Sequence, residues 1–340
     1  MSGDVRLLAS TSAFIFALAA TGLVRAYALH TGMLDRPSAR SSHSSPTPRA
    51  GGVAIVAAFF IAAAGLCIFG CLDGNVLLLL VGGGGAVAFI GYRDDRRPLT
   101  ARVRLFVHLA AAAFAVAVIG RALPYLAGIG AAGEWITRLF GVLVIAWATN
   151  LFNFMDGIDG IAAAEAVFVA AAGAVLTISF GADAGVSAAM LCLASASLGF
   201  LVWNWPPAKI FMGDAGSGFL GFTVAALGWA ASARGKFPIE VWGILAGVFL
   251  VDATVTLVRR LIRGERWFEA HRTHAYQHWA RRWGSHLPVT VAVAAINLCW
   301  LLPWAWLAAS RPQWAVAAFS AALLPLTGLA IVCGSGREER

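Results

Sequence analysis

The chain has 340 residues, of which 60% are hydrophobic and only 12% charged, and its mean hydropathy is +0.78. Soluble domains usually carry about a quarter charged residues. This composition therefore excludes a soluble domain and predicts an all-α integral membrane protein. The formal net charge of +8 suits anionic lipid headgroups or phosphorylated substrates. Because the basic residues are spread over separate loops, we expect no nucleic-acid partner.

Eleven apolar windows are long enough to cross a bilayer, since a spanning helix needs roughly 17–25 mostly apolar residues. The first window is longer than a signal-peptide core and has no small-residue cleavage pattern after it, so we expect it to be retained. We predict a single polytopic domain over residues 1–340. Its spans lie near residues 7–29, 51–70, 75–92, 103–121, 137–152, 160–180, 186–203, 216–232, 238–258, 288–309 and 313–333.

The basic residues predict the orientation of this arrangement. With eleven spans, 18 of the 25 lysine and arginine residues fall on one side of the membrane and six on the other. Lysine and arginine are enriched in cytoplasmic loops. The amino terminus is therefore predicted outside and the carboxyl terminus in the cytoplasm. Longer loops would explain part of the excess, but not the agreement of five separate segments on alternate sides.

Polar side chains concentrate in the predicted cytoplasmic loops. Ionisable groups beside membrane spans are costly and are usually functional. With little protein predicted outside the bilayer, we expect the active site to be assembled from loops and helix ends at one interface. The segments concerned are 30–50, 93–102, 153–160, 204–215 and 259–287.

The sequence NLFNFMDGIDG spaces two asparagines and two aspartates three residues apart, at Asn150, Asn153, Asp156 and Asp159. On a straight helix each step of three residues rotates the side chain by about 60°, so the four groups would diverge. The two glycines of the segment therefore predict a helix break, which would let both aspartates line a pocket. Helix capping would explain the asparagines but not the aspartates.

Adjacent carboxylates, Asp94 and Asp95, lie among five arginines in YRDDRRPLTARVR. Paired carboxylates at a helix end suit a Mg²⁺ ion with phosphate oxygens, or a proton acceptor. Salt bridges with the neighbouring arginines are the alternative interpretation.

Asp214 lies between glycines in WNWPPAKIFMGDAGSGF, ahead of an apolar span. Glycines allow a ligand close to the backbone, and amides at a helix start favour phosphate. A helix-capping role is the alternative for Asp214. Phe211 could stack on a base or face lipid.

Two further segments carry basic and titratable groups. The first, DRPSARSSHSSPTPRAGG, gathers Arg36, Arg40, His43 and Arg49, with a solvated linker as the alternative. The second contains His271, His274 and His278, whose spacing places them on one face of a predicted helix. Without a carboxylate in register, zinc binding is not favoured. Histidine and arginine there are placed to bind a diphosphate. Together the five segments indicate phosphoryl transfer, in which a metal and cations neutralise phosphate charge and a carboxylate manages a proton.

At these residues the chain resembles the polyprenyl-phosphate N-acetylhexosamine-1-phosphate transferases, which move a sugar 1-phosphate from a UDP-sugar to a polyprenyl phosphate. Eleven spans with an outside amino terminus are also that family's arrangement. The matching motifs are DRPSARSSH with PTPRAGG, YRDD, NLFNFMDGIDGIA, WNWPPAKIFMGDAGSGFLGF, and VDATVTLVRR through HRTHAYQ.

The resemblance implies a role for each site residue. Asp214 is the expected ligand of Mg²⁺, with Mn²⁺ as an alternative, and Asp94 or Asp95 is the expected base on the acceptor phosphate. The expected catalytic residues are Asp94, Asp95, Asp156, Asp159, His271 and His274. The expected substrate-binding residues are Asn150, Asn153, Asn204, Phe211, Arg272 and Arg49.

The last motif reads HRTHAYQ, whereas the related phospho-MurNAc-pentapeptide translocases carry three consecutive histidines there. This departure favours the branch that initiates O-antigen or other surface polysaccharides, using UDP-GlcNAc or a 6-deoxy relative such as UDP-FucNAc or UDP-QuiNAc. The expected reaction joins the sugar phosphate to undecaprenyl phosphate and releases UMP, on the cytoplasmic face of a bacterial inner membrane. A secondary transporter is the alternative function, and homodimer formation stays open.

Overall fold

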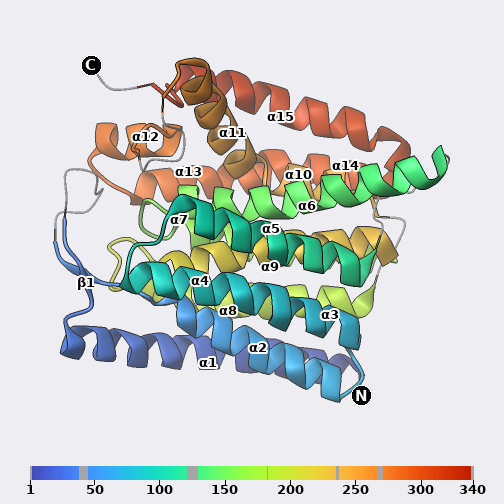
Figure 1. The fold of residues 1–340 in the computed structure, drawn as a ribbon, viewed down its shortest axis with the longest axis horizontal. Helices are drawn as coiled ribbons and strands as arrows, with labels where there is room; N and C mark the ends of the chain where they lie inside the picture. The colour runs from blue at the N-terminus through green and yellow to red at the C-terminus, as the bar shows by residue number, and fades with distance from the viewer. Residues whose placement is uncertain are drawn as a thin grey trace.

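The computed structural model describes residues 2–37, 45–120, 129–181, 183–234, 237–265 and 271–337. Most helices run roughly along one axis, and the strand pair and helix α12 lie at the same end of the bundle (Figure 1). Arg40 and His43 lie outside the described residues. The helices are α1 (Ser2–Thr31), α2 (Gly52–Ile68), α3 (Gly74–Leu79), α4 (Gly85–Arg96), α5 (Ala101–Ile119), α6 (Gly130–Met155), α7 (Ile161–Ser179), α8 (Ala184–Asn204), α9 (Asp214–Arg234), α10 (Glu240–Leu245), α11 (Gly247–Ile262), α12 (Ala275–Trp283), α13 (Leu287–Ile296), α14 (Leu302–Ser310) and α15 (Ala315–Val332).

Every one of the eleven predicted windows falls on helix. In the described part of the chain, nine segments are long and apolar enough to cross a membrane. Two of these contain a π-helical turn, η1 (Leu80–Gly84) between α3 and α4 and η3 (Asn297–Leu301) between α13 and α14. The other two windows correspond to α2, with 17 residues, and to α10 and α11, which are separated at Ala246. The chain is thus a helical, multi-pass membrane protein, and the count of eleven and the orientation stay predictions.

Helix α9 is the centre of the bundle. Of its apolar window 94% is buried inside the protein, compared with 17% for α1. Lipid is as apolar as leucine, so helices in membranes associate through close packing at small residues. Glycines provide this packing on three sides of α9: Gly52 of α2 meets Gly216, Gly221 meets the Ala148 backbone of α6, and Gly91 of α4 meets the Asp214 backbone. The residue that begins this central helix is therefore fixed by its neighbours.

The segment between α1 and α2 is joined to the start of α9 by backbone hydrogen bonds. The Phe211 N–H donates to the Pro48 carbonyl at 2.8 Å, and the Gly51 N–H donates to the Phe211 carbonyl at 2.9 Å. Two short strands, β1 (Leu34–Asp35) and β2 (Thr47–Pro48), pair antiparallel next to this contact. This small sheet is a local departure from the predicted all-α fold, and the backbone bonds with Phe211 join its second strand to a loop distant in sequence.

The contact of Gly91 with α9 gives the first testable prediction. A Cβ atom at Gly91 would lie closer than 3.0 Å to the backbone of Asp214 and Ala215. We expect Gly91→Ala to destabilise the protein by about 1–3 kcal/mol, because backbone cannot move aside as a side chain can. Thermal unfolding in detergent measures the effect. Gly85→Ala on the same helix is the control, since its nearest neighbour is the Phe60 ring at 4.0 Å. Equal unfolding temperatures for the two variants would contradict the prediction.

Candidate active site

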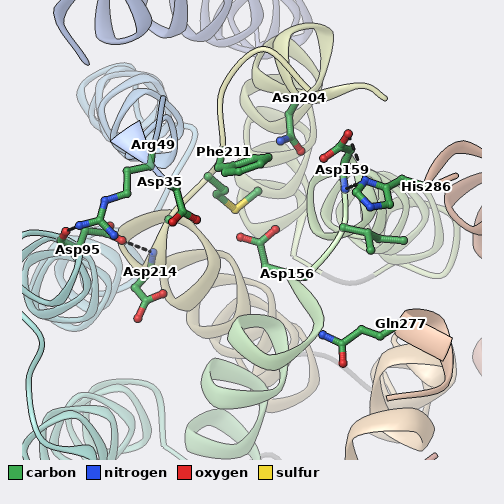
Figure 2. Close-up of a pocket in the computed structure, with 14 residues that line it drawn as sticks. Asp35, Arg49, Asp95, Asp156, Asp159, Asn204, Phe211, Asp214, Gln277 and His286 are labelled. Atoms are coloured by element: carbon green, nitrogen blue, oxygen red, sulfur yellow. Dashed lines mark hydrogen bonds and ion pairs between the residues drawn. The ribbon is translucent and has the colours of Figure 1, made fainter. Parts of the chain in front are cut away.

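A cavity of about 290 Å³ lies at the end of the bundle where the loops predicted to be cytoplasmic meet (Figure 2). Carboxylates dominate its polar lining, and an arginine and an aromatic ring face them. Seven of the predicted site residues line it: Arg49, Asp95, Asp156, Asp159, Asn204, Phe211 and Asp214. Predicted site residues from four of the predicted loop segments thus line one acidic pocket.

The predicted helix break lies between α6 and α7. Helix α6 ends at Met155 and α7 begins at Ile161, and Gly160 adopts a φ of +77°, a conformation that favours glycine. The break turns Asp156 into the cavity, between the carboxylates of Asp214 and Asp159 (Figure 2). Asp156 is therefore the carboxylate most surrounded by other acidic groups.

Asp159 is held by two other parts of the chain. Its Oδ2 accepts a hydrogen bond from the Ala208 N–H at 3.0 Å and lies 3.2 Å from Nδ1 of His286. The hydroxyl of Thr290 on α13 donates to the Asp159 carbonyl at 2.9 Å. Asp159 therefore joins the break after α6 to the 204–210 loop and to the start of α13.

Asn204 also connects the break after α6 to the 204–210 loop. Its Oδ1 accepts the Gly160 N–H at 3.0 Å, and its Nδ2 donates to the Ile210 carbonyl at 2.9 Å. Its side chain is buried, with 3% exposed. Asn204 thus sets the distance between the turn that carries Asp156 and the loop that carries Phe211.

Asp95 caps the central helix. Its Oδ1 accepts the Asp214 N–H at 3.0 Å, and its Oδ2 accepts the Ala215 N–H at 3.2 Å. Gly213, with a φ of +77°, lies so close to this carboxylate that a Cβ would be 2.7 Å from Oδ2. The guanidinium of Arg49 donates to the main-chain carbonyl of Asp95. The cap therefore orients Asp214, the first residue of α9.

Asp94 lies outside the cavity and forms an ion pair. Its Oδ2 lies 2.7 Å from Nη1 of Arg104, and the same nitrogen is 3.2 Å from Oδ2 of Asp214. A small recess of about 30 Å³ adjoins Asp214 here and is lined by Asn150, Asn153, Arg104 and His108, among others. Asp214 thus borders both the cavity and this recess.

The histidine motif is placed differently from the sequence interpretation. Helix α12 begins at Ala275, so His271 and His274 precede the helix, and the prediction of one helix face for all three histidines is wrong. His271, Arg272 and His274 line neither the cavity nor the recess. Burial, with nearby His274 and Arg260, lowers the pKa of His271 to about 3, so its ring is neutral at neutral pH.

The carboxylates of the cavity suit a cation that is bound by the protein and the substrate together. No group of three histidine, cysteine or acidic residues forms a ready-made metal site among the residues the structure describes. Mg²⁺ is usually bound through one or two carboxylates together with substrate phosphates. Asp214, whose side chain is 34% exposed, and Asp156 nearby offer hard oxygen ligands of this kind.

The sequence interpretation missed several lining residues. Asp35, Gln277 and His286 line the cavity, and Arg104 and His108 line the recess. Asp35 and Arg104 belong to segments already singled out, so their position beside charged neighbours was a usable signal. Gln277 ends the HRTHAYQ motif and His286 lies in the 259–287 segment, but both reach the cavity through the packing of α12 and α13, which no local pattern indicates.

The acidic surroundings of Asp156 give a pH prediction. Burial, together with repulsion from Asp214, Asp95 and Asp159, raises its pKa from 3.8 to about 8. The folded protein therefore holds this proton more tightly than the unfolded chain, so its stability falls as the pH rises between these values. Without metal, the free energy of unfolding of Asp156→Asn should not decrease over this pH range. At pH 8 we expect it to be larger than that of the wild type by at least about 1 kcal/mol.

The test is thermal unfolding of both proteins in detergent with a chelator, across the range from about pH 5 to about pH 8. Asp183→Asn, at the opposite end of the bundle, is the control for adding an amide and is expected to follow the wild type. Parallel pH curves for Asp156→Asn and the wild type would contradict the raised pKa.

Comparison with known proteins identifies the family of this chain. The profile of Glycosyl transferase family 4 matches residues 76–232. A Bacillus subtilis protein named probable undecaprenyl-phosphate N-acetylglucosaminyl 1-phosphate transferase is 32% identical, over 76% of this chain and 74% of its own length. The Yersinia pestis undecaprenyl-phosphate alpha-N-acetylglucosaminyl 1-phosphate transferase is 30% identical, over 77% and 73%. The Mycobacterium tuberculosis decaprenyl-phosphate N-acetylglucosaminephosphotransferase is 29% identical, over 84% and 78%. The chain therefore belongs to the polyprenyl-phosphate N-acetylhexosamine-1-phosphate transferases.

Proposed function

We propose that this protein transfers a sugar 1-phosphate from a UDP-N-acetylhexosamine to undecaprenyl phosphate, releasing UMP, with Mg²⁺ as cofactor. The observation that carries the proposal is the single cavity in which Asp95, Asp156 and Asp214 face Arg49 and Phe211. A bacterial inner membrane, with the cavity on the cytoplasmic face, suits the excess of basic residues in the same loops. The family membership favours this transferase over a secondary transporter.

Different residues of the site have different roles in the proposed reaction. The acceptor phosphate oxygen attacks the β-phosphorus of the donor, and UMP leaves. Bound Mg²⁺ would supply charge neutralisation at the diphosphate, with Asp214 and Asp156 as its protein ligands. Arg49 and Arg104 add positive charge that stabilises the developing phosphate charge. Of the two adjacent carboxylates only Asp95 lines the cavity, and each of its amide-bonded oxygens keeps a lone pair that can receive the acceptor proton.

The sugar is proposed to be GlcNAc or a 6-deoxy relative such as FucNAc or QuiNAc. The names of the three relatives support GlcNAc, and the HRTHAYQ motif supports the 6-deoxy sugars. Initiation of O-antigen or another surface polysaccharide follows from either. Incubating the purified protein with each UDP-sugar in turn distinguishes the donors.

Loss of Asp214 tests the proposed metal ligand. We expect Asp214→Asn to reduce UMP release by at least about a hundredfold at saturating Mg²⁺, because a neutral amide binds the cation weakly. The assay incubates membranes with labelled UDP-GlcNAc, or the donor found active, and measures label in the organic phase. Asp183→Asn makes the same chemical change at the cap of α8, where Asp183 pairs with Arg234 at 3.1 Å, and is expected to remain active. Near-normal turnover of Asp214→Asn would rule out the metal assignment.

A substitution at Phe211 tests the proposed binding position of the nucleotide base. Stacking of a base on an aromatic ring contributes about 1–3 kcal/mol. We therefore expect Phe211→Leu to raise the KM for the UDP-sugar by roughly tenfold, with little change in the KM for the lipid phosphate. Steady-state kinetics with each substrate varied separately measure the two KM values. Phe106→Leu is the control, since Phe106 is 72% exposed on α5, away from the cavity. An equal rise in both KM values would contradict a base-stacking role.

A further inference from the structure

The segment that follows α15 folds back against α11. Ser335 is fully buried, and its hydroxyl donates to Oδ1 of Asp252 on α11 at 2.7 Å. Nη1 of Arg259, also on α11, donates to the Ser335 carbonyl at 2.8 Å. The next residue, Gly336, donates its N–H to the Thr273 carbonyl at 2.5 Å. This short segment is therefore fixed between α11 and the chain that leads into α12.

Asp252 connects the segment to α12. The carboxylate is buried, with 5% of the residue exposed, and it accepts the Ala275 N–H at 3.0 Å and the Tyr276 N–H at 3.2 Å. These are the first two amides of α12, which lack partners inside the helix. A carboxylate at a helix start is stabilised by those donors and by the helix dipole. Ser335 completes the hydrogen bonding of the group that fixes where α12 begins.

Helix α12 in turn forms one wall of the acidic cavity. The Tyr276 hydroxyl donates to the Phe154 carbonyl at 3.0 Å, and it contacts the turn at Gly157 so closely that a Cβ there would collide with it. Gln277, the next residue, lines the cavity. The turn that Tyr276 supports is the one that carries Asp156. A continuous path of contacts thus runs from Ser335 through Asp252 and Tyr276 to Asp156.

We propose that Ser335 is a positioning residue for the donor-binding wall of the cavity, acting through Asp252 and the start of α12. The inference rests on the proposed function, in which Asp156, on the turn that Tyr276 supports, holds the metal at the donor diphosphate. Ser335 lies outside the α9 core that holds the spans together, so its hydroxyl orients α12 without holding the bundle. Its loss lets α12 shift away from the Asp156 turn.

Three variants separate the hydroxyl from the shape of the side chain. We expect Ser335→Ala to raise the KM for the UDP-sugar about tenfold while the lipid-phosphate KM stays unchanged. Losing a hydrogen bond to a buried carboxylate also lowers the unfolding temperature modestly, to the same degree with or without the donor-binding effect. Ser335→Thr and Ser335→Val have similar shapes, so the Thr variant should bind donor better than the Val variant. Ser320→Ala is the matched control, because Ser320 is an exposed serine on α15 whose hydroxyl bonds only within its helix.

A second measurement does not depend on catalysis. Hydrogen exchange should show faster exchange of the Ala275 and Tyr276 amides in Ser335→Ala than in wild type or Ser320→Ala. If wild-type protein transfers no sugar phosphate, the proposed function fails, and exchange alone still decides the inference. Wild-type amide protection in Ser335→Ala, or indistinguishable donor KM and exchange for the Thr and Val variants, would overturn it.

Discussion

The cap that Asp95 places on the first two amides of α9 is the contact on which the site depends. Helix α9 is the most buried of the membrane-spanning segments in the described chain, and Asp214 is its first residue. Backbone amides at a helix start need partners, and little water is available for them at the edge of a packed bundle. By supplying both partners from one carboxylate, Asp95 fixes where α9 begins and hence where Asp214 lies. Gly91 and Gly213 have no side chain because this contact leaves no room for one.

The resulting cavity carries more negative charge than its own cations neutralise. The carboxylates of Asp35, Asp95, Asp156, Asp159 and Asp214 line it, with Arg49 as the lining arginine. Burial, reinforced by repulsion from this excess charge, raises the pKa of Asp156 to about 8. A divalent cation would relieve the repulsion, whereas a phosphate alone would increase it. The electrostatics therefore favour metal and diphosphate binding together, which is how a few carboxylates bind Mg²⁺ without a closed protein cage.

The sequence predicted those features that depend on local composition. All eleven apolar windows are helical, and α6 ends before Gly157 as the spacing of Asn150 to Asp159 required. The choice between Asp94 and Asp95 was not predictable. Adjacent helical residues point about 100° apart, and only the packing of α4 on α9 decides which one faces the cavity. The histidines were misplaced because periodicity extended the helix to His271, whereas the contact of Asp252 starts α12 at Ala275.

The hydrogen-bond partners of the aspartates distinguish their roles at such a membrane face. An aspartate there can cap a helix or bind a ligand, and sequence motifs contain both kinds. Asp95 and Asp252 each give both oxygens to backbone amides, as Asp73 and Asp183 give one oxygen each at α3 and α8. Asp156 accepts no hydrogen bond from the described chain, and Asp214 is bound only by side chains. Asp156 and Asp214 have no backbone amide partner in the described chain and are therefore available to a metal and a diphosphate, and the capping aspartates hold them in place.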